Sequence, residues 1–139
     1  GKSASALIQA EYLLRKYFDI NGTIIRFGGL VGGERLAGRF LAGKKDIPNG
    51  QAPVNMIHRD DCIGILKEVI QQEAWGKTYN ATTDGHPCRQ DFYIAQADKY
   101  EFEPPIFLEE TQASGKVISN NVLKEDLGYR FIHPDPMLF

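Results

Sequence analysis

Hydrophobic residues recur at helical spacing near the start of the chain. The pattern predicts a helix that runs to about residue 18, and Ser3 or Ser5 is suited to cap its start. The apolar face of this helix would carry Leu7, Ala10, Leu14, Tyr17 and Phe18. A continuous apolar face of this kind either joins the core of the protein or forms an interface with another chain.

After this helix the pattern changes to short runs of β-branched residues separated by turns. The segment TIIRFGGLVG (23–32) predicts a short buried strand that enters a glycine-rich loop. The elements expected next are a helix at about 34–42, a loop at 44–53, an extended piece at 54–58, a helix through residue 70 and a strand at 77–83. Because helices and strands alternate, the sequence predicts an α/β fold with parallel strand pairing.

The last third of the chain is interrupted by prolines. A helix is expected at about 89–100, after Pro87, and the pair Pro104 and Pro105 breaks the chain beyond it. The segments PIFLEE (105–110) and GKVIS (115–119) are predicted to be edge strands, and a last helix is expected at 121–127, before Gly128.

Composition limits the classes of protein to which the chain can belong. Its 139 residues, 42% hydrophobic and 24% charged, are typical of one soluble domain with its own core. The net charge is −2 and the basic residues are scattered, so nucleic acid is not an expected partner. No apolar run approaches the roughly 20 residues that cross a bilayer. A charged-then-apolar signal segment is also missing at the start, so a cytoplasmic protein without membrane contact is expected.

The two cysteines do not have the spacing of a metal site or a disulfide framework. Cys62 and Cys88 lie far apart, outside any C-x-x-C pattern. Both are therefore interpreted as reduced thiols, with Cys62 buried on a helix, and no metal site is predicted.

The opening tripeptide Gly1-Lys2-Ser3 resembles the end of a phosphate-binding loop but is not interpreted as one. Such a loop needs a strand and glycine-spaced amides before its lysine.

Four segments occur in an order that is found in a known family. They are IQAEYLLRKY, TIIRFGGLVG, NMIHRDDCIGIL and GKTYNATTD. Their order resembles the carboxyl-terminal half of the extended short-chain dehydrogenases, the NAD-dependent epimerase/dehydratase family. The resemblance covers about residues 3–130, and the segments NMIHRDD and SNNVLKEDLGYRF are similar to a poorly characterised, atypical branch.

The resemblance implies a domain organisation and a cofactor. Residues 1–139 would form the carboxyl-terminal, substrate-side part of a Rossmann-like protein, with a small α+β region. In the family, the glycine fingerprint that holds the dinucleotide pyrophosphate lies in an amino-terminal part that this chain does not contain. The whole protein is therefore expected to use NAD or NADP, and this chain alone is expected to bind neither.

The family's catalytic Tyr-x-x-x-Lys pair does not match the one in this chain. When Glu11 is placed on the matching family position, the catalytic pair falls on Ser3 and Leu7, which cannot exchange protons with a substrate. Tyr12 and Lys16 have the same spacing but lie nine residues later. They are interpreted as a partly buried tyrosine and a solvated lysine, and the catalytic residues remain unknown.

The resemblance also points to cofactor contacts. Residues matching Phe27, Gly28 and Gly29 lie against the nicotinamide in relatives, although the position of Phe27 is usually a proline there. The glycines of GGLVGGE lack the fingerprint spacing, so they either contact a cofactor or allow another backbone to approach closely. Arg26, at the end of the same strand, would either pair with a carboxylate such as Asp61 or contact a ligand.

Candidate substrate-binding residues follow the loop before the third predicted helix. They are Asn55, His58, Arg59 and Asp60, a polar cluster of the kind that gathers at the crevice of an α/β fold. His58 and the neighbouring Asp61 are equally compatible with structural roles at a helix start. If Asn55 is a partly exposed loop residue, replacing it by alanine is expected to cost well under about 1 kcal/mol of stability.

One substitution narrows the substrate. Sugar-nucleotide members of the family carry a phosphate-clamping arginine at the position of Val54, and valine cannot bind a phosphate. Arg35 or Arg39 would be the remaining sources of positive charge, so a smaller substrate than a UDP-sugar or dTDP-sugar is expected.

Two classes of function follow from these observations. The first is an epimerase/dehydratase-like or oxidoreductase-like enzyme acting on an unidentified small molecule. The second is a non-catalytic relative that binds a dinucleotide as a sensor or scaffold. In either case the family resemblance implies a homodimer formed through the helix from Ala4 to Phe18.

Overall fold

The computed structural model describes residues 1–18, 21–109 and 114–139. Its elements are α1 (Lys2–Phe18), β1 (Ile24–Phe27), β2 (Gly29–Val31), α2 (Gly38–Leu41), β3 (Met56–His58), α3 (Arg59–Gln71), β4 (Thr78–Ala81), α4 (Arg89–Lys99), α5 (Asn121–Leu127) and the 3-10 helix η2 (Pro136–Leu138). The predicted alternation of helices and strands is confirmed. None of the described helices has the length and apolar character needed to cross a membrane.

The strands form two parallel pairs, as the alternation of elements predicted. Strand β1 pairs with β4, and β2 pairs with β3. The chain passes from the first pair to the second at Gly28 and Gly29, whose amides donate to the carbonyls of Ala81 (2.9 Å) and Asn55 (2.8 Å). This junction therefore joins the carboxyl ends of β1 and β4 to the amino ends of β2 and β3.

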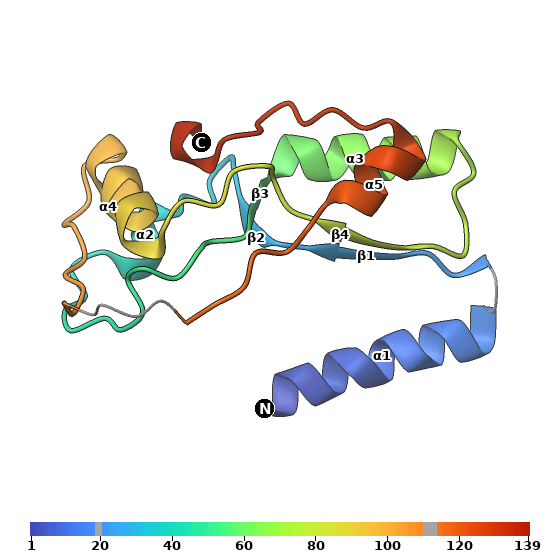
Figure 1. Cartoon of the computed structure of the whole chain (residues 1–139), viewed down its shortest axis with the longest axis horizontal. Helices are drawn as coiled ribbons and strands as arrows, with labels where there is room; N and C mark the ends of the chain where they lie inside the picture. The colour runs from blue at the N-terminus through green and yellow to red at the C-terminus, as the bar shows by residue number, and fades with distance from the viewer. Residues whose placement is uncertain (19–20, 110–113) are drawn as a thin grey trace.

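Helices α3 and α5 lie along one side of the strand pair β1–β4 (Figure 1). The core beneath them consists of Ile57, Cys62, Ile65, Val69, Tyr79, Ala81, Leu123 and Leu127. A second core surrounds β2 and β3 and consists of Val31, Ala37, Val54, Met56, Phe92 and Phe139. The burial of Cys62 on a helix is thus confirmed.

Helix α1 lies on the opposite side of the strands from α3 and contributes no buried residue (Figure 1). Two side-chain contacts connect it to the strands: Arg26 of β1 pairs with Glu11, and Arg15 donates to the Thr78 hydroxyl (2.8 Å). Arg26 thus pairs with a carboxylate, as one of the two expectations had it, but this carboxylate is Glu11 and not Asp61. Successive side chains of a strand point to opposite faces. Because Ile25 packs into the core beneath α3, Arg26 points toward α1.

Several local predictions were also wrong. The helix expected at 34–42 covers only Gly38–Leu41, because Gly32 and Gly33 have positive φ and a turn pairs Gly32 with Arg35. In β1 only Ile24 is buried, Ile25 is half-buried, and Arg26 and Phe27 are exposed. The expected partial burial of Tyr12 is also wrong, because α1 contributes no buried residue and 62% of Tyr12 is exposed.

Neither predicted edge strand forms within the described residues. Segment 105–109 makes one isolated bridge, between Phe107 and Ile47, and Glu110 lies outside the described residues. Segment 115–119 is extended but is held by side chains instead of a strand ladder. The last helix has the expected bounds and ends at Gly128, which adopts the left-handed conformation at φ 62°.

Candidate functional site

The junction between the strand pairs contains the predicted cofactor residues. A Cβ atom on Gly28 would lie 2.5 Å from the Asn55 carbonyl oxygen and 2.9 Å from the Thr82 methyl group. A Cβ on Gly29 would lie 2.6 Å from the sulfur of Met56. Gly28 is therefore required by the close approach of the chain's own backbone, whatever ligand lies beside it, whereas at Gly29 the near atom belongs to the flexible Met56 side chain.

One side of this junction is open. Phe27, at the carboxyl end of β1, is 39% exposed, and Gly29 is exposed as well. Ligands of open α/β sheets bind beyond the carboxyl ends of parallel strands, which is where Phe27 lies. The contact of Phe27, Gly28 and Gly29 with a cofactor stays a prediction that this placement allows.

Asn55 uses its side chain to hold a distant segment of the chain. Its amide nitrogen donates to the Lys116 carbonyl (2.9 Å), and its amide oxygen accepts from the Ile118 backbone N–H (2.7 Å). Buried Thr82, which sequence reasoning did not single out, donates its hydroxyl hydrogen to the Ile118 carbonyl (2.9 Å). Two side chains thus replace the ladder of the predicted edge strand at 115–119.

His58 lies at the end of β3, the strand that begins directly after Asn55. It is the last residue of β3 and the cap of α3, where its Nδ1 atom accepts from the Asp60 backbone N–H at 3.2 Å. Its ring packs under the glycine loop, since a Cβ on Gly32 would lie 2.7 Å from Nε2. Asn55 immediately precedes β3 and His58 ends it, so the structure does not bring their side chains into one crevice with Gly28 and Gly29.

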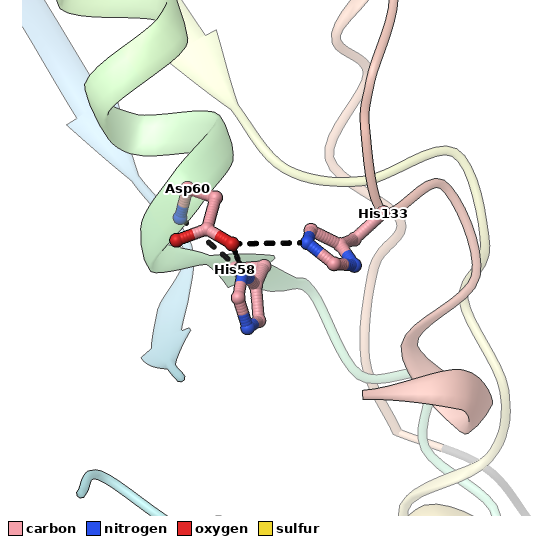
Figure 2. Close-up of side chains that lie close together, drawn as sticks. All are labelled: His58, Asp60 and His133. Atoms are coloured by element: carbon pink, nitrogen blue, oxygen red, sulfur yellow. Dashed lines mark hydrogen bonds and ion pairs between the residues drawn. The ribbon is translucent and has the colours of Figure 1, made fainter. Parts of the chain in front are cut away.

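His58, Asp60 and His133 form a cluster at the start of α3 (Figure 2). The Asp60 Oδ2 atom lies 3.4 Å from His58 Nδ1 and 3.2 Å from His133 Nε2, and the two rings are 3.9 Å apart between centroids. The hydrogen bond from His133 lowers the pKa of Asp60 below its usual range. Burial, followed by the charge of His133, lowers the pKa of His58.

The other predicted residue of this region, Arg59, extends toward solvent. Its guanidinium lies 3.3 Å from Asp60 Oδ1, and 55% of its side chain is exposed. The structure therefore brings together three of the four predicted substrate residues, His58, Arg59 and Asp60, and leaves Asn55 apart. It adds His133, which sequence reasoning missed because a single histidine between Ile132 and Pro134 carries no recognisable spacing.

Asp61 is completely buried and has a structural role. Its carboxylate accepts from the backbone N–H groups of Ile132 (2.7 Å) and His133 (3.0 Å) and from the Tyr129 hydroxyl (2.9 Å). These bonds fasten residues 129–133 to the first turn of α3. They also fix the backbone from which the His133 side chain projects.

A surface hollow of about 400 Å³ lies beside α2. It is lined by Glu34, Arg35, Leu36, Arg39 and Phe40. The guanidinium of Arg35 lies 5.0 Å from the centre of the Phe40 ring and donates from Nε to the Leu30 carbonyl (2.8 Å). Both arginines considered from the sequence therefore border one cavity.

Comparison with known proteins gives the class of this fold. No family model matches the chain. It is 37% identical over 137 residues to Protein YeeZ of Escherichia coli strain K12, a match that covers 98% of this chain and 50% of YeeZ. The chain thus spans about half the length of the curated relatives it matches.

Solved structures agree with this match. A putative NAD-dependent epimerase/dehydratase from Methylobacillus flagellatus is 30% identical, with a TM-score of 0.67 over 92% of this chain and 47% of that one. The UDP-glucose 4-epimerase of Thermus thermophilus, solved with NAD, is 13% identical with a TM-score of 0.65, over 96% of this chain and 50% of that one. The human epimerase family protein SDR39U1, solved with NADPH, is 17% identical with a TM-score of 0.60, over 83% of this chain and 45% of that one.

The chain therefore has a Rossmann-like α/β fold of the extended short-chain dehydrogenase type. The solved structures that it resembles include NAD-dependent epimerase/dehydratase proteins, of whose chains it covers about half, and this similarity agrees with the resemblance found in the sequence.

Proposed function

We propose that this chain is the substrate-side part of an NAD(P)-dependent epimerase/dehydratase-like or oxidoreductase-like protein. Its substrate is a small molecule that is not a sugar nucleotide. The dinucleotide pyrophosphate is held by a part of the protein like the half of YeeZ that lies outside the match. The nicotinamide end reaches this chain at Phe27, Gly28 and Gly29.

The exposed carboxyl end of β1 is the observation that carries this proposal. Phe27 is a large apolar side chain, 39% exposed, at the end of a parallel strand. The next two residues are glycines, and Gly28 cannot be enlarged without a clash with the Asn55 backbone. An apolar side chain followed by close-packed backbone offers a flat surface on which a nicotinamide ring can lie.

The α2 hollow supports the choice of substrate. Its volume of about 400 Å³ is in the range of sites for small molecules, and Arg35 and Arg39 supply positive charge at its border. Val54 is buried in the second core, so no cation replaces the pyrophosphate clamp at that position. We infer a small substrate with one anionic group, bound near Arg35 and Arg39.

A chimera tests the proposal that another part of the protein binds the dinucleotide pyrophosphate and this chain contacts the nicotinamide. The half of YeeZ that the match leaves out is joined to this chain, and binding of NADH and NADPH is measured by nicotinamide fluorescence. We expect the chimera to bind one of them and this chain alone to bind neither. Micromolar binding by the 139 residues alone, or no binding by a folded chimera, would contradict the proposal.

A variant in the chimera tests the contact itself. Phe27→Ala is expected to weaken dinucleotide binding, because it removes the apolar surface beside the nicotinamide. Phe40→Ala, at the exposed hollow beside α2, serves as the matched control and is expected to leave dinucleotide binding unchanged.

One observation favours the second candidate function, a non-catalytic dinucleotide sensor or scaffold. The positions that would carry the catalytic pair are the exposed residues Ser3 and Leu7, and neither side chain is a general base. Tyr12 is also exposed. A chimera that binds dinucleotide but does not transfer hydride to any small carbonyl compound would support this second function.

A further inference from the structure

We propose that His58, Asp60 and His133 form a binding site for one divalent transition-metal ion of the zinc class. The three side chains come from the end of β3, the first turn of α3 and the carboxyl-terminal segment (Figure 2). Two imidazoles and one carboxylate are a common ligand set for such ions, with further positions left to water or a ligand. The inference is independent of the proposed dinucleotide chemistry.

The distances between the ligand atoms suit a small ion. Asp60 Oδ2 lies 3.4 Å from His58 Nδ1 and 3.2 Å from His133 Nε2, and all three atoms lie within 4.8 Å of one another. Ligands about 2.0–2.2 Å from a tetrahedral zinc ion are roughly 3.3–3.6 Å apart. The two separations that involve Asp60 therefore match a tetrahedron within about 0.2 Å.

The protonation of His58 is also suitable. Its Nδ1 atom accepts a hydrogen bond from the Asp60 backbone N–H, so the lone pair that a metal needs is already on that nitrogen. Metal binding would replace two 3.2 Å contacts, the hydrogen bond from the Asp60 backbone N–H to His58 Nδ1 and the one between His133 Nε2 and Asp60 Oδ2. His133 would bind the ion as the tautomer that carries its proton on Nδ1.

The surroundings hold the ligands in place and still leave an entry path. Asp61 binds the backbone N–H of His133 at 3.0 Å, which positions that side chain over the start of α3. The side chains of Asp60 and His133 are 40% and 34% exposed, so an ion can reach them from solvent. Among the described residues, the guanidinium of Arg59 also contacts Asp60, through Oδ1, and leaves Oδ2 to face the two histidines.

Binding would tie two distant parts of the chain together. His133 is 73 residues from Asp60, and the segment that carries it ends in η2 against the second core. An ion at this site would attach the carboxyl-terminal segment to α3 in addition to the hydrogen bonds that Asp61 makes with its backbone. We therefore expect metal binding to raise the melting temperature and to protect residues after Tyr129 from proteolysis.

Titration with metal salts tests the site in the complete 139-residue chain. After treatment with EDTA and its removal, Zn²⁺ is titrated calorimetrically at pH 7.5, and Co²⁺ is titrated while its visible absorption is recorded. The variants are Asp60→Asn, which preserves shape, and His133→Gln. His86→Gln is the matched control, because His86 bonds to the Val54 carbonyl outside the cluster.

We expect one Zn²⁺ per chain, with Co²⁺ bands of four- or five-coordinate geometry. Each ligand variant should lose about ten-fold or more in affinity, and His86→Gln should lose none. Circular dichroism shows whether each variant is folded. If His133→Gln is not folded, the metal titration of Asp60→Asn tests the proposal. The proposal is overturned if the folded chain takes up no ion saturably, or if binding is the same in Asp60→Asn and the unaltered chain.

Discussion

Arg26 of β1 and Glu11 of α1 form a two-pronged ion pair, with N–O distances of 2.8 and 2.6 Å. Half of the Arg26 side chain is exposed, and exposed pairs of this kind contribute only about 0–1 kcal/mol. Because α1 contributes no buried residue, it is weakly attached to the rest of the chain. Its apolar residues are therefore available to a partner.

We predict that the chain associates with itself through α1. The exposed apolar residues of the helix are Leu7, Ile8, Tyr12, Leu13, Tyr17 and Phe18. Burying them between two copies would remove a large apolar surface from water. Sedimentation equilibrium should show dimers or larger species that Ile8→Glu converts to monomers. Val122→Glu, at an equally exposed apolar residue of α5, should not have this effect, and a chain that is monomeric at high concentration would contradict the prediction.

Loss of the Glu11–Arg26 pair should loosen α1 without unfolding the protein. Glu11→Gln is expected to lower the free energy of unfolding by less than about 1 kcal/mol, since the pair is exposed. Hydrogen exchange of the α1 amides should become faster, while exchange in α3 stays the same. Glu125→Gln on α5 is the control, and equal effects of the two variants on α1 would show that the pair does not hold the helix.

Replacement of Gly28 should be costly. An alanine Cβ would lie 2.5 Å from the Asn55 carbonyl oxygen, a backbone atom that cannot move without shifting β3. We expect Gly28→Ala to lower the free energy of unfolding by about 1–3 kcal/mol, measured by urea denaturation. An unchanged transition midpoint would mean that the junction between the strand pairs is looser than described.

Asn55 should contribute more to stability than the sequence suggested. Its side chain makes hydrogen bonds with the backbone of Lys116 and Ile118, and an alanine leaves both groups without this partner. We expect Asn55→Ala to cost about 1–3 kcal/mol, not the well under 1 kcal/mol expected for a free loop residue. Faster hydrogen exchange at the Ile118 amide should accompany the loss, and unchanged exchange there would refute the structural role.

The Tyr129–Asp61 contact should give the stability a dependence on alkaline pH. Burial, and then the hydrogen bond to Asp61, raise the pKa of Tyr129, so the folded state keeps the phenol protonated. The unfolded tyrosine ionises near pH 10, which favours unfolding as the pH rises further. The contribution of this residue is thus complete below about pH 10 and is lost above it.

Tyr129→Phe separates this effect from other titrations. At pH 8 the variant should be less stable by about 1–2 kcal/mol, because Asp61 loses one donor but keeps two backbone donors. The difference in unfolding free energy between the two proteins should narrow between about pH 10 and 11. The pKa values of Tyr79 and Tyr93 are also raised, but both residues are present in both proteins, so their contributions cancel in this difference. A constant difference would mean that the Tyr129 pKa is not raised.

The sequence alone determined the order of the main helices and parallel strands. The helical spacing of apolar residues and the glycine that ends the last helix at Gly128 are local features, and each depends only on its neighbours along the chain. The alternation of these elements gave the α/β class and its parallel pairing. For the same reason, the four quoted segments were enough to indicate the family.

Contacts between distant segments were decided only by the tertiary structure. The partner of Arg26 depended on which face of β1 the helix α3 covers, and the extended segment at 115–119 was fixed by Asn55 and Thr82. His133 joins His58 and Asp60 only because buried Asp61 binds the backbone 71 and 72 residues away. Such contacts have no characteristic residue spacing by which they could be recognised in a sequence, since they arise when separately formed elements pack together.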